Sequence, residues 1–208
     1  MRRFTVACVL RSGGPVYSPE WVAKLSRGVA RWMGERHRFV CLSDVPVPCE
    51  RIPLRDARPG WYSKIELFRP GQFEGTVLYL DLDTLVVDTL RPILDVAAGP
   101  LAMLSDFYRP AIPASGVMAW TAGDPSVLDV WEGLSSTTAH NPRARLDYEI
   151  AKHVEPRRLQ SLAPGAIVSL KAHARSAIPG GAALVCGHGR PRFSDARAGW
   201  AHRHWSEQ

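Results

Sequence analysis

The chain has 208 residues, of which 46% are hydrophobic and 22% charged, so we expect one globular domain with a sizeable core and not two domains. No apolar segment reaches the roughly 18 to 20 residues that a membrane-spanning helix needs, and the first ten residues lead into a strand-like pattern without a small-residue cleavage site, so we expect a cytoplasmic protein. The formal net charge of +6 is compatible with nucleic acid, an acidic membrane surface or an anionic small substrate.

The basic residues are scattered along the chain and are nearly all arginine. No run of like charge forms a nucleic-acid-binding tail, and no interleaved aromatic and basic pattern is present, so a nucleic acid is not an expected partner. The planar guanidinium donates two parallel hydrogen bonds to a phosphate. The composition therefore favours a phosphate-bearing ligand, and the basic surface is compatible with peripheral membrane contact.

The four cysteines, at positions 8, 41, 49 and 186, form no CxxC pair and have no disulfide-rich density around them. Three of them lie in or beside apolar runs. We expect buried free thiols and neither a disulfide nor a zinc site.

In the first half of the chain, short apolar strands alternate with helical patterns, which predicts an α/β sandwich with a largely parallel sheet. Ser18, Pro19 and Glu20 supply an N-cap, a proline at the first helical position and an early acid, so a helix is expected from there. We predict strands at 4–10, 38–42, 51–54 and 76–80, helices at 19–33 and 61–68, and an irregular, proline-rich segment at 43–59.

The second half continues the alternation and then becomes rich in loops after position 135. Asp124 followed by Pro125 predicts the cap of a helix that ends near position 133. We predict helices at 92–98 and 147–154 and strands at 101–105, 116–120, 167–170 and 183–186. The last residues, including His202, His204 and Trp205, are expected to form a frayed tail.

Two carboxylates follow the apolar run at 76–80. Successive side chains of a strand alternate between its faces, so Asp81 and Asp83 are expected to point the same way while Leu82 packs behind them. Two like charges that close repel each other unless a cation lies between them. The pattern therefore indicates a hard divalent ion such as Mg²⁺ or Mn²⁺, shared with substrate phosphates.

Three motifs occur in a fixed order over nearly the whole chain. They are Asp81-Leu82-Asp83 at mid-chain, residues 115–118 (Ser-Gly-Val-Met) downstream, and His188-Gly189-Arg190-Pro191 near the end. Together they resemble the nucleotide-sugar glycosyltransferases of the GT-A fold, close to the glycogenin-like family 8 group. The resemblance implies a single GT-A-like, Rossmann-like α/β domain whose mixed, mostly parallel sheet is flanked by helices. Its nucleotide-binding part would be about 1–105, and 106–208 would complete the acceptor and metal sites.

The resemblance implies a metal site of Asp83 and His188, with Asp81 sharing the metal or contacting the nucleotide ribose. Imidazole together with carboxylates suits Mn²⁺ better than Mg²⁺. The metal would bridge the two phosphates of the donor and neutralise charge on the departing diphosphate. Arg190, where relatives often have lysine, and Lys64 are further candidates for contacts with the phosphates.

The same resemblance assigns the remaining site residues. Ligands bind at the carboxyl ends of strands in open α/β sheets, so Leu10, Arg11 and Ser12 are expected to meet the base and ribose. Asp106 would hold the donor sugar, and Asp147 would face the sugar and acceptor.

The implied activity is transfer of a sugar, with retention, from a nucleotide diphosphate sugar that is expected to be uridine-linked. The acceptor is open: a glycan, a lipid-linked glycan, a protein or a small molecule. The chain departs from the family pattern at Ala114 and Tyr148, where relatives commonly carry asparagine and glutamine that contact sugar hydroxyls.

The sequence is also compatible with two other functions, a phosphatase and a non-catalytic binding protein. The acid pair also occurs in haloacid dehalogenase-type phosphatases, but these usually continue with glycine and threonine, whereas Thr84 follows directly here, and no lysine lies between Asp83 and Asp124. A non-catalytic nucleotide-sugar-binding relative would also suit the two departures. Each residue also has an ordinary explanation: turn acids, a surface histidine, an exposed Lys64, and a strand terminus or helix cap at Asp106 and Asp147.

Overall fold

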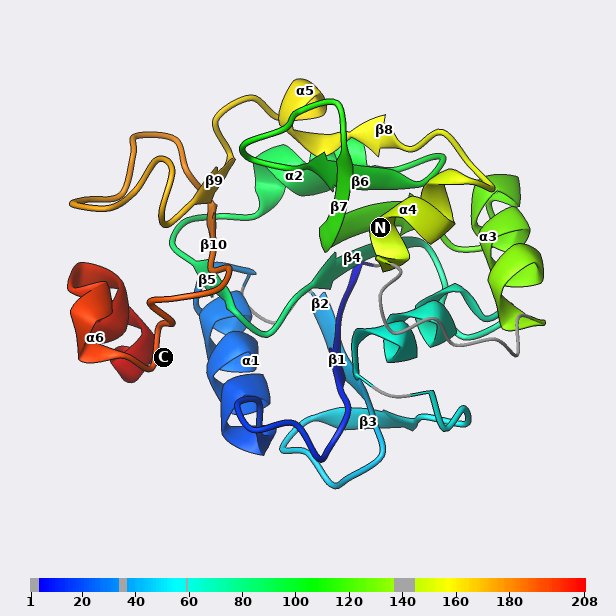
Figure 1. Cartoon of the computed structure of the whole chain (residues 1–208), viewed down its shortest axis with the longest axis horizontal. Helices are drawn as coiled ribbons and strands as arrows, with labels where there is room; N and C mark the ends of the chain where they lie inside the picture. Colours follow the sequence, from blue (N-terminus) through cyan, green and yellow to red (C-terminus); the bar gives the residue numbers. More distant parts are fainter. Residues whose placement is uncertain (1–3, 34–36, 59, 137–144) are drawn as a thin grey trace.

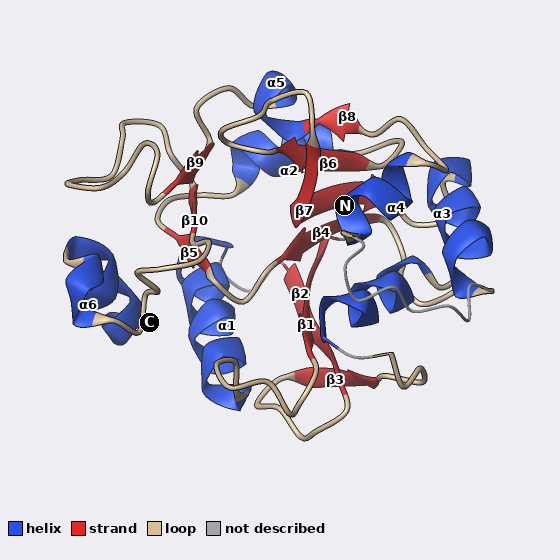
Figure 2. Cartoon of the chain, in the orientation of Figure 1, coloured by secondary structure: helices blue, strands red, loops and turns tan. Residues whose placement is uncertain are grey.

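The structure is a computed structural model that describes residues 4–33, 37–58, 60–136 and 145–208 (Figures 1 and 2). Position 59, where the predicted irregular segment ends, and positions 137–144 of the predicted loop-rich region lie outside the described residues. No helix in the described part of the chain has the length and apolarity to cross a membrane.

A mixed seven-stranded sheet forms the centre of the molecule. Its strands are β1 (Phe4–Leu10), β2 (His37–Ser43), β3 (Glu50–Pro53), β4 (Thr76–Leu80), β6 (Ala102–Ser105), β7 (Pro113–Thr121) and β8 (Arg157–Arg158). The order is β3-β2-β1-β4-β7-β6-β8, and only β7 is antiparallel to its neighbours, β4 and β6. The predicted fold class is confirmed, although β7 is longer than the expected strand at 116–120.

A second sheet of three short strands lies beside the first. It contains β5 (Thr84–Val86), β10 (Leu184–Cys186) and β9 (Ile167–Ser169) in that order. Strand β10 is antiparallel to β5 and parallel to β9. Because β5 begins one residue after Asp83, this pairing carries the C-terminal part of the chain to the acid pair.

Helices cover both faces of the central sheet (Figure 2). They are α1 (Pro19–Met33), α2 (Arg91–Ala97), α3 (Pro125–Ser135), α4 (Leu146–Ala151), α5 (Leu159–Leu162) and α6 (Trp200–Glu207), with 3₁₀ helices η1 (Gly60–Phe68) and η2 (Ala196–Ala198). The predicted helix at 61–68 is therefore of the tighter 3₁₀ type. Asp124 caps α3 as expected, because its side chain accepts a hydrogen bond from the Ser126 amide at 3.0 Å.

The alternation of side chains along β4 divides the core into two layers. Leu78 and Leu80 pack in the cluster that contains the apolar residues of α1, α2 and the small sheet. Val77 and Tyr79 face the other side, in the cluster with η1, α3 and α4. A strand buried on both faces reads as a continuous apolar run, which is why β4 was predictable with its observed bounds.

The expectation of a frayed C-terminal tail is wrong. Residues 200–207 form α6, which packs beside α1 (Figure 1). The Trp205 ring lies 4.9 Å from the ring of Trp21 between centroids, and the Lys24 ammonium lies 4.4 Å from the Trp205 centroid. The amide of Gln208 donates to the Val86 carbonyl at 2.9 Å. The aromatic and cationic side chains of α1 hold the end of the chain, and this partnership is not visible in a local sequence pattern.

The expected burial of the cysteines is confirmed for three of the four positions. All four are free thiols; Cys8, Cys41 and Cys186 are buried, while Cys49 is half-buried.

Candidate functional site

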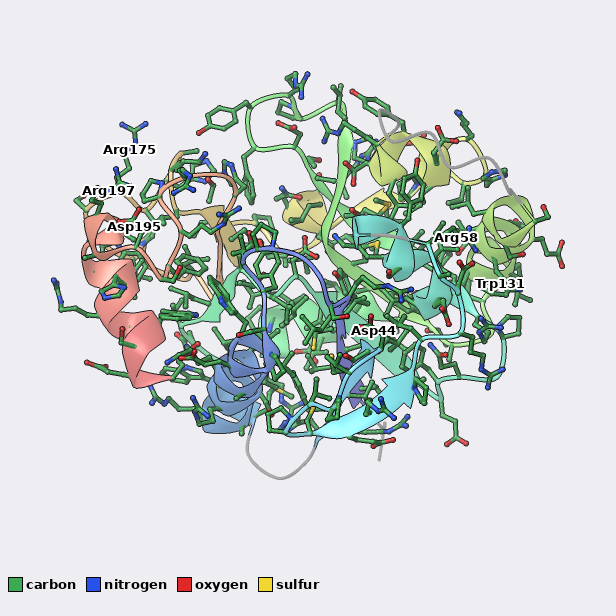
Figure 3. All side chains as sticks on the ribbon, turned by 60° about the horizontal axis from the view of Figure 1, so that its bottom comes forward. Asp44, Arg58, Trp131, Arg175, Asp195 and Arg197 are labelled. Carbon is green, nitrogen blue, oxygen red and sulfur yellow. The ribbon has the colours of Figure 1, made fainter. Side chains whose placement is uncertain are left out.

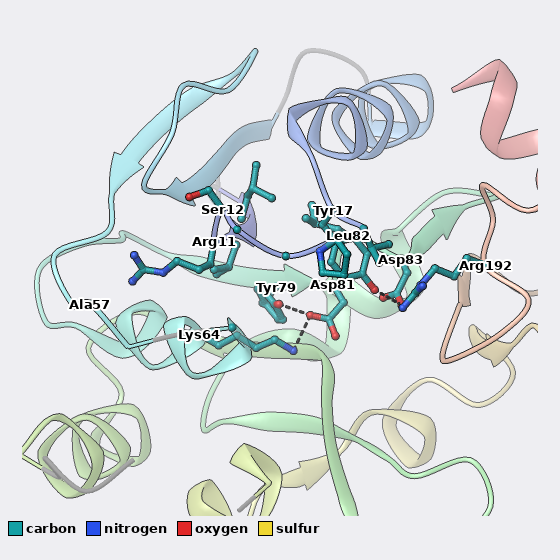
Figure 4. Close-up of a pocket in the computed structure, with 17 residues that line it drawn as sticks. Arg11, Ser12, Tyr17, Ala57, Lys64, Tyr79, Asp81, Leu82, Asp83 and Arg192 are labelled. Atoms are coloured by element: carbon teal, nitrogen blue, oxygen red, sulfur yellow. Dashed lines mark hydrogen bonds and ion pairs between the residues drawn. The ribbon is translucent and has the colours of Figure 1, made fainter. Parts of the chain in front are cut away.

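A cavity of about 680 Å³ opens at the carboxyl ends of β1 and β4 (Figure 4). Its walls are the loop after β1, the acid turn after β4, part of η1, and one residue of the C-terminal segment, Arg192. The predicted residues that line it are Leu10, Arg11, Ser12, Lys64, Asp81 and Asp83. We refer to this cavity as the main pocket.

Asp81 is held by contacts from three elements. Its backbone amide donates to the Gly116 carbonyl of β7 at 2.9 Å. Its carboxylate forms an ion pair with Lys64 of η1 at 2.7 Å and accepts a hydrogen bond from the Tyr79 hydroxyl. Lys64 is only 9% exposed, so its interpretation as an ordinary surface lysine is wrong.

Asp83 borders the same pocket, and Leu82 between the acids is buried; residues 81–83 form a turn after β4, so this placement does not come from strand alternation. The Asp83 carboxylate accepts a hydrogen bond from the Tyr17 hydroxyl at 2.8 Å. Burial, followed by the charge of Asp81, raises the pKa of Asp83 to about 7 despite the Tyr17 hydrogen bond. Burial and the Asp83 charge raise the pKa of Tyr17, so this hydroxyl remains a donor. Ionisation of both acids together is therefore unfavourable in the metal-free protein.

This raised pKa predicts how stability depends on pH without divalent ions. Between pH 4 and 7 the folded protein retains the Asp83 proton that the unfolded chain releases, so the free energy of unfolding should fall with rising pH, by on the order of 2 kcal/mol. Asp83→Asn should remove this component. Denaturant unfolding of both proteins at pH 5 and pH 8 in a chelator measures the difference, and equal pH dependence in both would contradict it.

Residues 115 and 116 connect the acid pair to Asp147. The Ser115 amide donates to the Asp147 carboxylate at 2.7 Å, and the Ser115 carbonyl accepts from Lys64 at 3.5 Å. Arg145 pairs with Asp147 at 2.9 Å and lies 4.0 Å from Asp106. The predicted sugar-binding acids are thus joined through one guanidinium.

A smaller cavity of about 250 Å³ adjoins this network. Its lining residues are Lys64, Ser115, Arg145, Leu146 and Asp147. Lys64 borders both this cavity and the main pocket. Tyr148, one of the departures from the family pattern, is 40% exposed and stacks under Arg145 at 5.3 Å from the ring centroid.

The loop after β1 is fixed by its own polar contacts. The Ser12 amide and hydroxyl donate to the Asp44 carboxylate at 2.8 and 2.7 Å. Partial burial opposes the shift, yet these hydrogen bonds keep the pKa of Asp44 below its usual range. The Arg11 guanidinium donates to the Ser63 hydroxyl at 3.0 Å and extends away from the acid pair (Figure 4). Arg11 thereby links η1 to the loop after β1.

His188 is not among the residues that line the main pocket. Its ring lies 2.7 Å from the Ser169 hydroxyl and stacks on Phe107 with the centroids 5.9 Å apart. Burial and the nearby Lys171 charge lower the pKa of His188. Among the described residues, no group of three His, Cys, Asp or Glu side chains is arranged to hold a metal ion.

The acid pair has the carboxylate chemistry that a hard divalent ion requires. Asp81 and Asp83 offer carboxylate oxygens at one pocket, and burial followed by the Asp81 charge raises the pKa of Asp83, so a divalent ion at the pair would favour its ionised form. The residues present therefore fit an ion held by two carboxylates and substrate phosphates.

Arg192 is the charged pocket residue that sequence reasoning missed, besides Tyr17 and Tyr79, which donate to the two acids. The Gly187 amide donates to the Asp83 carbonyl at 2.7 Å, which anchors the loop after β10 beside the acid turn. Arg192 then reaches the main pocket from the side opposite Lys64 (Figure 4). The predicted Arg190 is exposed and borders a different cavity. The only sequence signal for Arg192 was its place two residues beyond Arg190 in the same cluster.

Comparisons with known proteins identify the fold. No family model matches the chain, and no curated protein sequence matches it. The galactosyltransferase LgtC, solved with donor and acceptor sugar analogues, superposes with a TM-score of 0.55 at 12% identity, covering 98% of this chain and 94% of LgtC.

Two other glycosyltransferases give higher TM-scores over longer chains. The apo form of GlyE from Streptococcus pneumoniae TIGR4 superposes with a TM-score of 0.69 at 11% identity, covering 99% of this chain and 60% of GlyE. The bifunctional WbbM gives 0.63 at 11% identity, with 100% and 52% coverage. At these identities the likeness concerns the fold, and the chain has the GT-A-like fold of these glycosyltransferases.

Proposed function

We propose that this protein transfers a sugar from a nucleotide diphosphate sugar, expected to be uridine-linked, to an acceptor in a divalent-cation-dependent reaction. The observation that carries the proposal is the main pocket, where Asp81 and Asp83 lie between the cations Lys64 and Arg192. Acidic and basic groups together suit a metal-bound diphosphate, because the acids take the metal while the cations contact phosphate oxygens. The sugar-transferring neighbours of the same fold support this choice.

Asp81 and Asp83 would hold Mn²⁺ or Mg²⁺, which would neutralise charge developing on the departing diphosphate. Tyr17 and Tyr79 donate to these carboxylates and fix their direction. The third ligand expected from the family motif, His188, remains a prediction that requires its side chain to turn from Ser169 and Phe107 toward the acids.

The nucleotide and the sugar of the donor would bind in two different cavities. The loop with Leu10, Arg11 and Ser12 would receive the base and ribose in the main pocket. The sugar would enter the smaller cavity, where Asp147 offers a carboxylate oxygen to its hydroxyls and Lys64 lies at the boundary with the diphosphate. Retention of configuration is proposed from the family resemblance.

Titration of UDP and of GDP, each with and without Mn²⁺, tests the proposal. We expect one nucleotide to bind with an affinity that falls when the metal is chelated. Metal-independent binding, or no binding of either nucleotide, would exclude the transferase.

Two further assays separate the alternatives. Hydrolysis of a UDP-sugar without hydrolysis of a generic phosphomonoester favours the transferase over a phosphatase. Metal-dependent nucleotide binding without hydrolysis or transfer, across a broad acceptor panel, would identify a non-catalytic relative.

A further inference from the structure

A second basic cavity, of about 630 Å³, adjoins the main pocket. It is lined by Pro15, Val16, Arg190, Arg192, Ser194 and Asp195, and we call it the arginine cavity. Three of these residues, Pro15, Val16 and Arg192, also line the main pocket. The two cavities therefore share one wall, and Arg192 is its only charged member.

The arginine cavity has an excess of unpaired positive charge. Within the described parts of the chain, neither Arg190 nor Arg192 has a hydrogen-bond or ion-pair partner for its guanidinium. The one acid in the lining, Asp195, is engaged by Arg197 at 2.6 Å at the edge of the molecule (Figure 3). The cavity thus offers two free guanidinium groups, while its carboxylate is already neutralised.

We propose that the arginine cavity binds a phosphate group of a second substrate, so that the acceptor is a phosphate-bearing molecule. A guanidinium has five N–H donors in a planar fork, enough for an anion on each of two edges. Arg192 would contact the donor diphosphate on one side and this second phosphate on the other. The identity of the second substrate as an acceptor rests on the proposed function; the anion site itself does not.

The test measures inorganic phosphate binding to protein already saturated with UDP and Mn²⁺. We expect phosphate to bind without displacing UDP, and Arg190→Gln to weaken phosphate at least tenfold. The control is Arg203→Gln, which removes the same charge from an exposed position on α6 that lines neither cavity and should leave phosphate affinity unchanged. Equal phosphate affinity in the wild type and Arg190→Gln, or displacement of UDP by phosphate, would overturn the proposal.

The source of the phosphate is resolved by comparing two ligands. Glycerol 3-phosphate represents a soluble acceptor, and vesicles with phosphatidylglycerol represent a membrane-bound one, with phosphatidylcholine vesicles as the neutral control. If either phosphate source binds in an Arg190-dependent way, the result supports the site. If neither source binds, the arginine cavity is not an acceptor site. Phosphate binding is also measured directly on the protein without UDP. If UDP does not bind but phosphate binds through Arg190, the proposed function fails and the anion site remains, so the two failures give different results.

Discussion

Alanine in place of Asp83 should abolish the metal-dependent part of UDP binding, with a loss of about 100-fold in affinity, or about 2.7 kcal/mol. The reason is that a metal held by two carboxylates loses half of its protein ligands, and the diphosphate loses its bridge to the acid turn. Asp83→Asn should lose nearly as much, because an amide keeps the shape and removes the charge. Calorimetric titration of UDP with Mn²⁺ and with a chelator measures both variants.

Asp88→Ala is the matched control for this experiment. Asp88 lies five residues along the same segment, is exposed and lines none of the described cavities. Its replacement should leave UDP affinity unchanged. If Asp83→Ala binds UDP as the wild type does in Mn²⁺, the acid pair is not the metal site.

Lys64→Met should reduce both stability and UDP affinity. The Lys64 ammonium lies 2.7 Å from Asp81 with 11% of its side chain exposed, so its loss leaves the Asp81 carboxylate without its cation in the pocket wall. Because the Asp81 side chain is 30% exposed, we expect about 2 kcal/mol of destabilisation, less than the removal of one partner from a fully buried pair. Denaturant unfolding and UDP titration measure the two effects.

The control for Lys64 is Lys152→Met, which breaks the exposed pair between Lys152 and Glu149 at 2.8 Å. That pair should contribute no more than about 0.5 kcal/mol. In the double variant Lys64→Met with Asp81→Asn, part of the lost stability should return, because the uncompensated carboxylate is gone. Equal destabilisation by the two lysine variants would show that the Lys64 pair is an ordinary surface contact.

Local signals explain which elements the sequence predicted well. Strands β1 and β4 are continuous apolar runs, and α3 begins with an aspartate cap followed by proline, so the sequence predicted their positions closely. The sequence did not predict the direction of β7, because parallel and antiparallel strands that are buried on both faces have the same apolar pattern. Helix α6 was missed because its stability depends on Trp21 and Lys24, far away in the chain.

The residues of the candidate site also differ in how well the sequence predicted them. The acid pair and the loop after β1 follow strands directly, so topology alone carries them to one edge of the sheet. Arg190 and Arg192 are two residues apart and chemically identical, and only the path of the loop after β10 decides which of them enters the main pocket. His188 shows the same limit, because its contact with Ser169 depends on the neighbouring strand β9.

The pairing of β5 with β10 has a consequence for how the chain tolerates changes of length. Each strand contributes three residues, and Cys186 is opposite Thr84, the residue after Asp83. Inserting one residue into either strand would shift the register between them, displace the loop that carries Arg192 relative to Asp83, and turn neighbouring side chains to the opposite face. The loop at 175–181, mostly exposed, can lengthen without that penalty, so length variation among close relatives should concentrate there and be excluded from the two strands.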